Sequence, residues 1–323
     1  MLLRALFILS SATTPTFALP VGTTNQNATL GSTVHIINIP DISSQACNTK
    51  QPSQELKNTH KALRDNPHLH PRTTQQIQVN VYSHFVTTFD QAYHYPPNVR
   101  KNLIGKQIDA LNAAYQSANI AFAPKTTSYT VRDDWATDAN STNMKNSLRQ
   151  GGYADLNIYF QTNLSSAPYR YSPASTLLGY CTLPTNMTYP NGHGGLTEFP
   201  PYDYATDGCN VLAASMPQSP VKVYGYDLGK TAVHEVGHWF GLLHTFQDNT
   251  CDPSDPGDFM NDTPQESIST SGCPTGKNSC PNRAGYDPIN NYMDYSTDEC
   301  YTQFTPDQQA RMISMYNLYR QNE

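Results

Sequence analysis

Residues that can bind a metal ion are concentrated in one short stretch of the sequence, HEVGHWFGLLH, which begins at His234. On a helix, His234 and His238 lie four residues apart on one face, so both imidazoles can bind one zinc ion at roughly 2.0–2.1 Å. Glu235 directly follows the first histidine, so it can reach a water molecule on the metal without binding the metal itself. Gly241 can end the helix in a left-handed conformation, and the resulting turn would bring His244 back as a third ligand.

This stretch matches the extended zinc-protease motif H-E-x-x-H-x-x-G-x-x-H. Three protein ligands leave one coordination position open for water, which is typical of a catalytic rather than a structural zinc site. The alternative is an amphipathic helix that contains histidines by chance, but three of the ten histidines of the chain fall in this stretch. We therefore expect one zinc ion per chain, bound by His234, His238 and His244, with Glu235 as general base.

Apolar residues beside the motif predict that its helix packs into a core beneath a cleft. They are Leu228, Val233, Val236, Phe240 and Leu243.

Apolar spacing from residue 75 onward predicts an α+β fold with a mixed twisted sheet, an active-site helix and a C-terminal helix. Strands are expected at 77–81, 120–122, 129–131, 156–160 and 210–214, and helices at 97–118 and 305–319, the last one starting with a capping box. We expect the strand at 156–160 to lie at an edge of the sheet, where an extended substrate can pair with it.

The first 18 residues are expected to be a secretory signal peptide. Arg4 precedes a short apolar run, and residues 16–18 place small residues at the two positions that signal peptidase reads. The run is too short for a membrane span, and no later segment is apolar enough for one. An apolar N-terminus without this function is the alternative. A secreted, extracellular protein is therefore expected.

Residues 19–74 are rich in Thr, Asn, Ser, Gln and Pro, and we interpret them as a pro-segment or linker before a catalytic domain at 75–323. One short helix is expected at 53–64, capped by Ser53. The alternative is an ordered N-terminal extension of the domain.

Composition limits the partners of the chain. The net charge is −6, and no cluster of Lys and Arg indicates a nucleic-acid or membrane partner. Five Asn-x-Ser/Thr acceptors are candidate glycosylation sites of a secreted chain: Asn27, Asn140, Asn163, Asn186 and Asn261.

Seven cysteines fit an oxidising compartment that pairs most of them. Four of them follow the zinc motif, and their irregular spacing favours disulfides over a second zinc site, with three pairings open. Cys181 and Cys209 are candidates for a third bridge on the other side of the motif. The four are Cys251, Cys273, Cys280 and Cys300.

Further motifs downstream give the chain a resemblance to the metzincin clan and, within it, to the pappalysin-like family and its fungal secreted metalloproteases. The matching segments, beside the zinc motif, are 255–258, 262–264, 291–295 and 304–306 with 311–312. The resemblance implies a metzincin-type catalytic domain and a secreted zinc-dependent endopeptidase that acts on proteins or peptides. The alternative is a catalytically silent secreted binding protein of this fold, which would be expected to have lost the glutamate or a histidine.

The resemblance also implies roles for individual residues. Met293 matches the methionine of the Met-turn beneath the histidines, and the alternative is an ordinary core methionine. Tyr295 matches a tyrosine whose phenol can donate a hydrogen bond to the developing oxyanion, and the alternative is a tyrosine packed on the turn. The resemblance further implies that residues after the Met-turn, such as Asp294, Thr297 and Asp298, partly shape the pocket beside the scissile bond.

For the cysteines, the resemblance implies the crossed pairing Cys251–Cys280 with Cys273–Cys300. The remaining Cys47 lies in the expected pro-segment, and a thiolate is a good zinc ligand. It could hold the precursor inactive until cleavage near Arg72. Relatives often carry Gly after such a cysteine, whereas Asn48 follows here, and a free or intermolecular cysteine is the alternative.

An acidic loop follows the zinc motif. Its four aspartates, Asp252, Asp255, Asp258 and Asp262, are of the type that binds Ca²⁺ through six to eight oxygens. A solvated acidic loop is the simpler interpretation.

Overall fold

The computed structural model of the chain describes residues 35–37, 47–66, 69, 75–164, 177–190, 196–198 and 201–321. The chain divides into two units, Met1–Thr33 and Val34–Glu323, and all of the described residues belong to the second one. The expected signal peptide at 1–18, the acceptor Asn27 and the expected cleavage position Arg72 lie outside the described residues.

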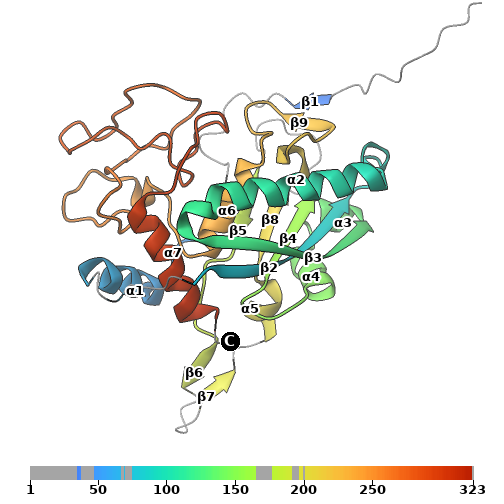
Figure 1. Cartoon of the computed structure of the whole chain (residues 1–323), viewed down its shortest axis with the longest axis horizontal. Coiled ribbons are helices and arrows are strands. Elements are labelled where there is room, and N and C mark those ends of the chain that lie inside the picture. Colours follow the sequence, from blue (N-terminus) through green and yellow to red (C-terminus); the bar gives the residue numbers. More distant parts are fainter. Residues whose placement is uncertain are drawn as a thin grey trace, which may run out of the picture. The chain divides into compact units, whose positions relative to one another are not determined.

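A five-stranded sheet forms the centre of the second unit, with the strand order β3-β2-β4-β8-β5 (Figure 1). The first four strands run parallel and β5 runs antiparallel at one edge, which confirms the mixed sheet. The strands are β2 (Ile77–Thr87), β3 (Ile120–Val131), β4 (Leu156–Gln161), β5 (Gly179–Cys181) and β8 (Cys209–Leu212).

Two details of the expected strands are wrong. The strands expected at 120–122 and 129–131 are the two ends of the single strand β3, whose middle residues 124–127 are exposed and carry no apolar pattern. β4 is an interior strand and not an edge, because β2 and β8 flank it and all six of its residues are buried. Its polar residues Asn157 and Gln161 are buried and hydrogen-bonded to Gln150 and Trp135.

Helices cover both faces of this sheet (Figure 1). The long helix α2 (Pro97–Tyr115) and the motif helix α6 (Lys230–Trp239) both contribute buried side chains to the main core, together with the sheet. The short helices α3 (Asp133–Ala136) and α4 (Ser141–Leu148) form a smaller core on the opposite face. The expected helix at 97–118 is α2 followed by the 3-10 turn η3 (Gln116–Ala118).

Of the five apolar residues expected to bury the motif helix, four are buried. Leu228 is the exception, because it precedes the helix N-cap Gly229 and its side chain is 45% exposed.

The two helices with predicted caps form as expected. α7 (Pro306–Tyr319) begins with a capping box in which Thr305 and Gln308 bond each other's backbone N–H. α1 (Gln54–Asp65) is capped by Ser53, whose hydroxyl accepts a hydrogen bond from Leu56 N at 3.1 Å.

α1 packs on α7 through a small apolar cluster that includes Leu56, Leu63, Met315 and Tyr319. The strand β1 (His35–Ile37) pairs in parallel with β9 (Val221–Val223). Two described parts of the segment 19–74 therefore lie against the domain.

The remaining elements are short. They are η2 (Ala92–His94), β6 (Thr188–Pro190), β7 (Leu196–Glu198), α5 (Pro201–Thr206), η4 (Ala213–Ser215) and η5 (Gln247–Asn249). No helix within the described part of the chain is long and apolar enough to cross a membrane. Among the glycosylation candidates, Asn140, Asn163 and Asn261 are exposed and Asn186 is half-buried.

Three disulfides connect the region around α6. Cys181–Cys209 joins the edge strand β5 to β8, and its Cα atoms are 4.1 Å apart. The pairs Cys251–Cys280 and Cys273–Cys300 cross each other in the sequence, as the family resemblance implied. Residues 250–305 contain no named helix or strand, so these two bridges constrain a long irregular segment.

Candidate active site

The helix α6 and the turn that follows it bring the three histidines of the motif together. The helix ends at Trp239, and two residues later Gly241 has a φ of +88°. The N–H groups of Gly241 and Leu242 bond the carbonyls of His238 and Gly237 at 2.8 and 2.9 Å. This is the Schellman arrangement, which favours glycine because of its positive φ. The Nε2 atom of His238 consequently lies 3.1 Å from the Nε2 atoms of both His234 and His244.

The two helical histidines are oriented by their second nitrogens. The Nδ1 atom of His234 lies 2.7 Å from the carbonyl of Tyr292, and that of His238 lies 2.8 Å from the carbonyl of Leu242. A carbonyl can only accept, so each Nδ1 carries the proton and each Nε2 offers a lone pair. Burial lowers the pKa of His234 to about 4 and the pKa values of His238 and His244 well below 6.5. Neutral imidazole is the form that binds a metal.

The spacing of these nitrogens fits a single tetrahedral zinc ion. Ligands about 2.0–2.1 Å from zinc at tetrahedral angles are about 3.3–3.4 Å apart, close to the observed 3.1 Å. Cys47 joins the group, and one ligand atom from each of the four residues lies within 4.8 Å of the others. Within the described parts of the chain this is the only such group of His, Cys, Asp or Glu.

The four aspartates of the acidic loop do not converge in that way. Asp252, Asp255 and Asp258 each accept a hydrogen bond from a backbone N–H two residues further along, at Ser254, Gly257 and Met260. Asp262 accepts one from the backbone of Asp307 in the first turn of α7. These carboxylates stabilise turns, and Asp258 is buried rather than solvated.

Glu235 lies against the edge strand β5, where only glycine fits. A Cβ atom on Gly179 would be 2.8 Å from Glu235 Oε1 and 2.7 Å from its Cγ. Sequence reasoning missed Gly179, whose only signal is a glycine inside a short strand. Burial raises the pKa of Glu235 to about 8. A divalent cation beside the carboxylate would lower this pKa, because it stabilises the charged form.

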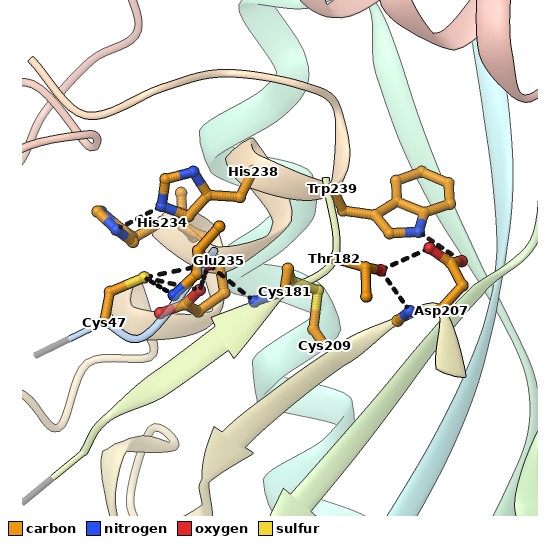
Figure 2. Close-up of a disulfide and its surroundings, with 12 residues drawn as sticks. Cys47, Cys181, Thr182, Asp207, Cys209, His234, Glu235, His238 and Trp239 are labelled. Carbon is orange, nitrogen blue, oxygen red and sulfur yellow. Dashed lines mark hydrogen bonds between the residues drawn. A yellow bond between two sulfur atoms is a disulfide. The ribbon is translucent and has the colours of Figure 1, made fainter. Parts of the chain in front are cut away.

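Figure 2 shows Cys47 turned toward Glu235 and the histidines, next to the Cys181–Cys209 disulfide. Its sulfur lies 3.4 Å from Glu235 Oε2 and 3.2 Å from the hydroxyl of Thr49. Burial, and then the charge of Glu235, raises the pKa of the Cys47 thiol well above its usual range. A metal ion at the histidines would oppose both effects by stabilising the thiolate.

The segment around Cys47 runs along the edge of the sheet. Cys47 forms a parallel bridge with Gly179, and Asn48 N donates to the carbonyl of Gly179 at 3.1 Å. The hydroxyl of Thr49 accepts a hydrogen bond from Cys181 N at 3.0 Å and lies 3.4 Å from Glu235 Oε2. The segment therefore occupies hydrogen-bonding groups of β5 as well as the space next to Glu235.

Tyr295 points its hydroxyl at the same centre. The phenol oxygen lies 3.3 Å from His244 Nε2 and donates to the carbonyl of Cys47 at 3.3 Å. Burial, followed by the charges of Cys47 and Glu235, raises the phenol pKa well above 10, so the hydroxyl stays a hydrogen-bond donor. Tyr295 also lines a small pocket beside the histidines, together with Tyr226, Thr231 and Tyr301.

The two aspartates after the Met-turn do not line that pocket. Asp294 accepts hydrogen bonds from the backbone N–H groups of Thr270 and Tyr295. Asp298 accepts one from Leu228 N at 2.7 Å, just before the N-terminus of α6.

At the other end of α6, a buried ion pair attaches the helix to the C-terminus of α7. Arg320 contacts Asp207 with an N–O distance of 3.1 Å, and Arg320 Nε donates to the carbonyl of Trp239 at 3.0 Å. The indole of Trp239 donates to the same Asp207 carboxylate at 3.2 Å (Figure 2). These contacts fix the helix that carries the first two histidines.

Met293 lies directly against α6, and the helix makes room for it with a glycine. A Cβ atom on Gly237 would be 2.5 Å from the sulfur of Met293, which is fully buried. We therefore expect Gly237→Ala to lower the free energy of unfolding, since overpacking typically costs about 1–3 kcal/mol and exceeds the helix-propensity gain of about 1 kcal/mol.

The matched control for this prediction is Gly105→Ala in α2, where an added Cβ meets no atom within 4 Å. That variant should keep or raise stability. Urea unfolding of both variants measures the difference, and a Gly237→Ala protein as stable as the Gly105→Ala protein would contradict the close approach of Met293.

The profile of the peptidase M43 family, described as pregnancy-associated plasma protein-A, matches residues 193–317. An extracellular metalloprotease of Neurospora crassa is 42% identical over 249 residues, which cover 76% of this chain and 77% of the relative. One of Aspergillus fumigatus is 38% identical over 269 residues, covering 78% and 80%.

Solved structures with a similar fold come from Tannerella forsythia. A promirolysin mutant superposes with a TM-score of 0.60 at 22% identity, covering 84% of this chain and 94% of its own. Mature mirolysin in complex with a cleaved peptide gives a TM-score of 0.55 at 24% identity, covering 76% and 93%. These likenesses show a shared fold, and they agree with the metzincin-type architecture expected from the sequence.

Proposed function

The chain belongs to the peptidase M43 or pappalysin-like family of extracellular metalloproteases, and we propose that it hydrolyses internal peptide bonds at a zinc ion bound by His234, His238 and His244. The observation that carries this proposal is the convergence of the three imidazoles, in which His238 Nε2 lies 3.1 Å from the Nε2 atoms of both His234 and His244, beside the carboxylate of Glu235. The alternative of a silent binding protein has no support in the site, since the glutamate and all three histidines are present.

When bound, zinc supplies a Lewis acid and makes water acidic enough to react near neutral pH. The protein residues supply the proton transfers. Glu235 takes a proton from the attacking water and later passes it to the leaving amine. The Tyr295 hydroxyl donates a hydrogen bond to the oxyanion that develops on the scissile carbonyl. Support for this role comes from the distance of 3.3 Å between the Tyr295 hydroxyl oxygen and His244 Nε2.

The substrate is proposed to bind as an extended strand along β5, rather than along β4 as the sequence suggested. β5 is the edge strand that contains Gly179, and Gly179 lies against Glu235. Support comes from residues 47–49, which already use this edge for a main-chain hydrogen bond at 3.1 Å. Strand addition of this kind gives affinity through the backbone and leaves specificity to side-chain pockets.

Residues 19–74 are proposed to be a pro-segment that blocks this site through Cys47. The segment occupies the same strand edge as the proposed substrate, and its thiol joins the group of three histidines. Asn48 replaces the glycine that is frequent after such a cysteine in relatives. The Asn48 side chain is exposed, so the larger residue is accommodated without a clash. Its backbone N–H still donates to the carbonyl of Gly179.

The ligand set is tested by His244→Ala. This variant should fold but bind zinc more weakly than the wild type by more than the roughly 10–100-fold that loss of an outer-shell partner costs. Zinc content after dialysis against a weak chelator measures the effect, and circular dichroism checks the fold. His94→Ala, in η2 away from the site, is the control. Full zinc occupancy in His244→Ala would remove His244 from the ligand set.

A further inference from the structure

A buried cluster of charges lies in the irregular segment after the zinc motif, and no step of the proposed mechanism uses it. The ammonium of Lys277 lies 2.7 Å from Glu266 Oε1 and 2.8 Å from Asp287 Oδ2, and both carboxylate side chains are fully buried. A third carboxylate, that of Asp294, is also buried and interacts electrostatically with Glu266 and Lys277. Such a cluster is weak evidence for stability, because apolar residues of similar size often serve as well.

Glu266 is connected to the third histidine of the site. Its Oε2 atom accepts a hydrogen bond at 2.8 Å from the hydroxyl of Thr245, the residue that follows His244. The N–H of Thr245 in turn donates to the carbonyl of Met293 at 3.2 Å. Thr245 and Glu266 are both buried, so water does not compete for this hydrogen bond. The bond therefore fixes the backbone next to His244.

Glu266 is also connected to the Met-turn and to Tyr295. The hydroxyl of Thr270 donates to Glu266 Oε1 at 3.2 Å, and its N–H donates to Asp294 Oδ1 at 2.9 Å. The same Asp294 oxygen accepts from Tyr295 N at 2.7 Å. One hydrogen-bonded path therefore runs from the neighbour of His244, through Glu266 and Thr270, to the backbone of Tyr295.

Two disulfides hold Lys277 in this place. Cys273 and Cys280 flank it, and they are bonded to Cys300 and Cys251. Lys277 Nζ also donates to the carbonyl of Ile268. Burial, and then the charge of Asp294, raises the pKa of Glu266 to about 7, while the hydrogen bond from Lys277 lowers it. The ammonium thus favours the carboxylate, which can accept hydrogen bonds from both threonines at once.

We propose that Glu266, with Lys277 as its counter-ion, is a positioning residue of the active site that fixes His244 through Thr245 and Tyr295 through Thr270 and Asp294. The inference rests on the proposed zinc site. Outer-shell partners of this kind typically change metal affinity or activity by about 10–100-fold when they are removed. The crossed disulfides then contribute to function, because they hold Lys277 next to Glu266.

The test uses variants of the processed enzyme that break the path at different points. Thr245→Val removes the hydroxyl but keeps the shape, and Lys277→Met removes the counter-ion. Both should raise the Kd for zinc about 10-fold or more and lower kcat more than they change KM. Lys277→Arg should keep the Kd for zinc and kcat within about threefold of the wild-type values, because a guanidinium can bridge two carboxylates.

Zinc affinity is measured by competition with a chromophoric chelator, kinetics with a peptide substrate, and Tm by thermal unfolding. Lys222→Met is the matched control, because Lys222 forms a 2.9 Å ion pair with Asp227 outside this path, and it should leave zinc affinity and kcat unchanged. Variants with a lower Tm but wild-type zinc Kd and kcat would show a merely structural role and overturn the inference alone. A wild-type enzyme that binds no zinc would overturn the proposed function and this inference together.

Discussion

We expect the Glu235→Gln variant to keep its zinc and its fold while losing nearly all of its turnover. The amide has the shape of the carboxylate and fits against Gly179 in the same way, but it cannot accept the proton of the attacking water. General base catalysis typically contributes on the order of 10² to 10⁴-fold, so kcat should fall by about that factor. Zinc content should stay at the wild-type level, since Glu235 is not among the proposed ligands.

The matched control is Glu299→Gln, which changes an exposed glutamate after the Met-turn and should leave kcat unchanged. Kinetics on a peptide substrate, with metal analysis of the same samples, separates loss of the base from loss of the metal. Near-normal turnover in Glu235→Gln would mean that the general base is misassigned.

We expect the wild-type precursor to be inactive and the Cys47→Ala precursor to show most of the activity of the processed enzyme, or to process itself. The sulfur lies 3.4 Å from Glu235 and within the histidine group, so it would occupy the position proposed for the attacking water. X-ray absorption should detect a zinc–sulfur distance of about 2.3 Å in the precursor and not in the processed form.

Asn48→Ala is the control for this experiment, because the Asn48 side chain is exposed and the variant should remain latent. Equal activity of the wild-type precursor and the processed enzyme would refute latency altogether. If Cys47→Ala stays as latent as the wild type, the block lies in another group of the segment. Thr49 is then the first residue to replace, because its hydroxyl contacts both Glu235 and the β5 backbone.

Features set by neighbours in the sequence could be predicted. The spacing of the histidines, the positive φ at Gly241 and the caps at Ser53 and Thr305 all depend on a few adjacent residues. Helix geometry converts such spacing directly into position in space. These predictions therefore needed no knowledge of the fold.

Features set by distant contacts could not be predicted. The place of β4 inside the sheet depends on strand order, because its neighbours β2 and β8 come from distant parts of the sequence. Gly179 and Gly237 are required only because Glu235 and Met293 approach them from other elements. Glu266 was not singled out, because nothing in the sequence shows that Thr245 and Lys277 meet it.

We propose that this chain hydrolyses peptide bonds with a zinc ion at the three histidines. This proposal is tested most directly by following cleavage of a peptide library by the processed protein, first as purified, then after chelation, and then after one equivalent of zinc is added back. We expect cleavage within peptide chains, its loss on chelation and its return at one zinc per chain. Cleavage that survives complete metal removal, or zinc-loaded processed protein that cleaves no peptide, would contradict the proposal.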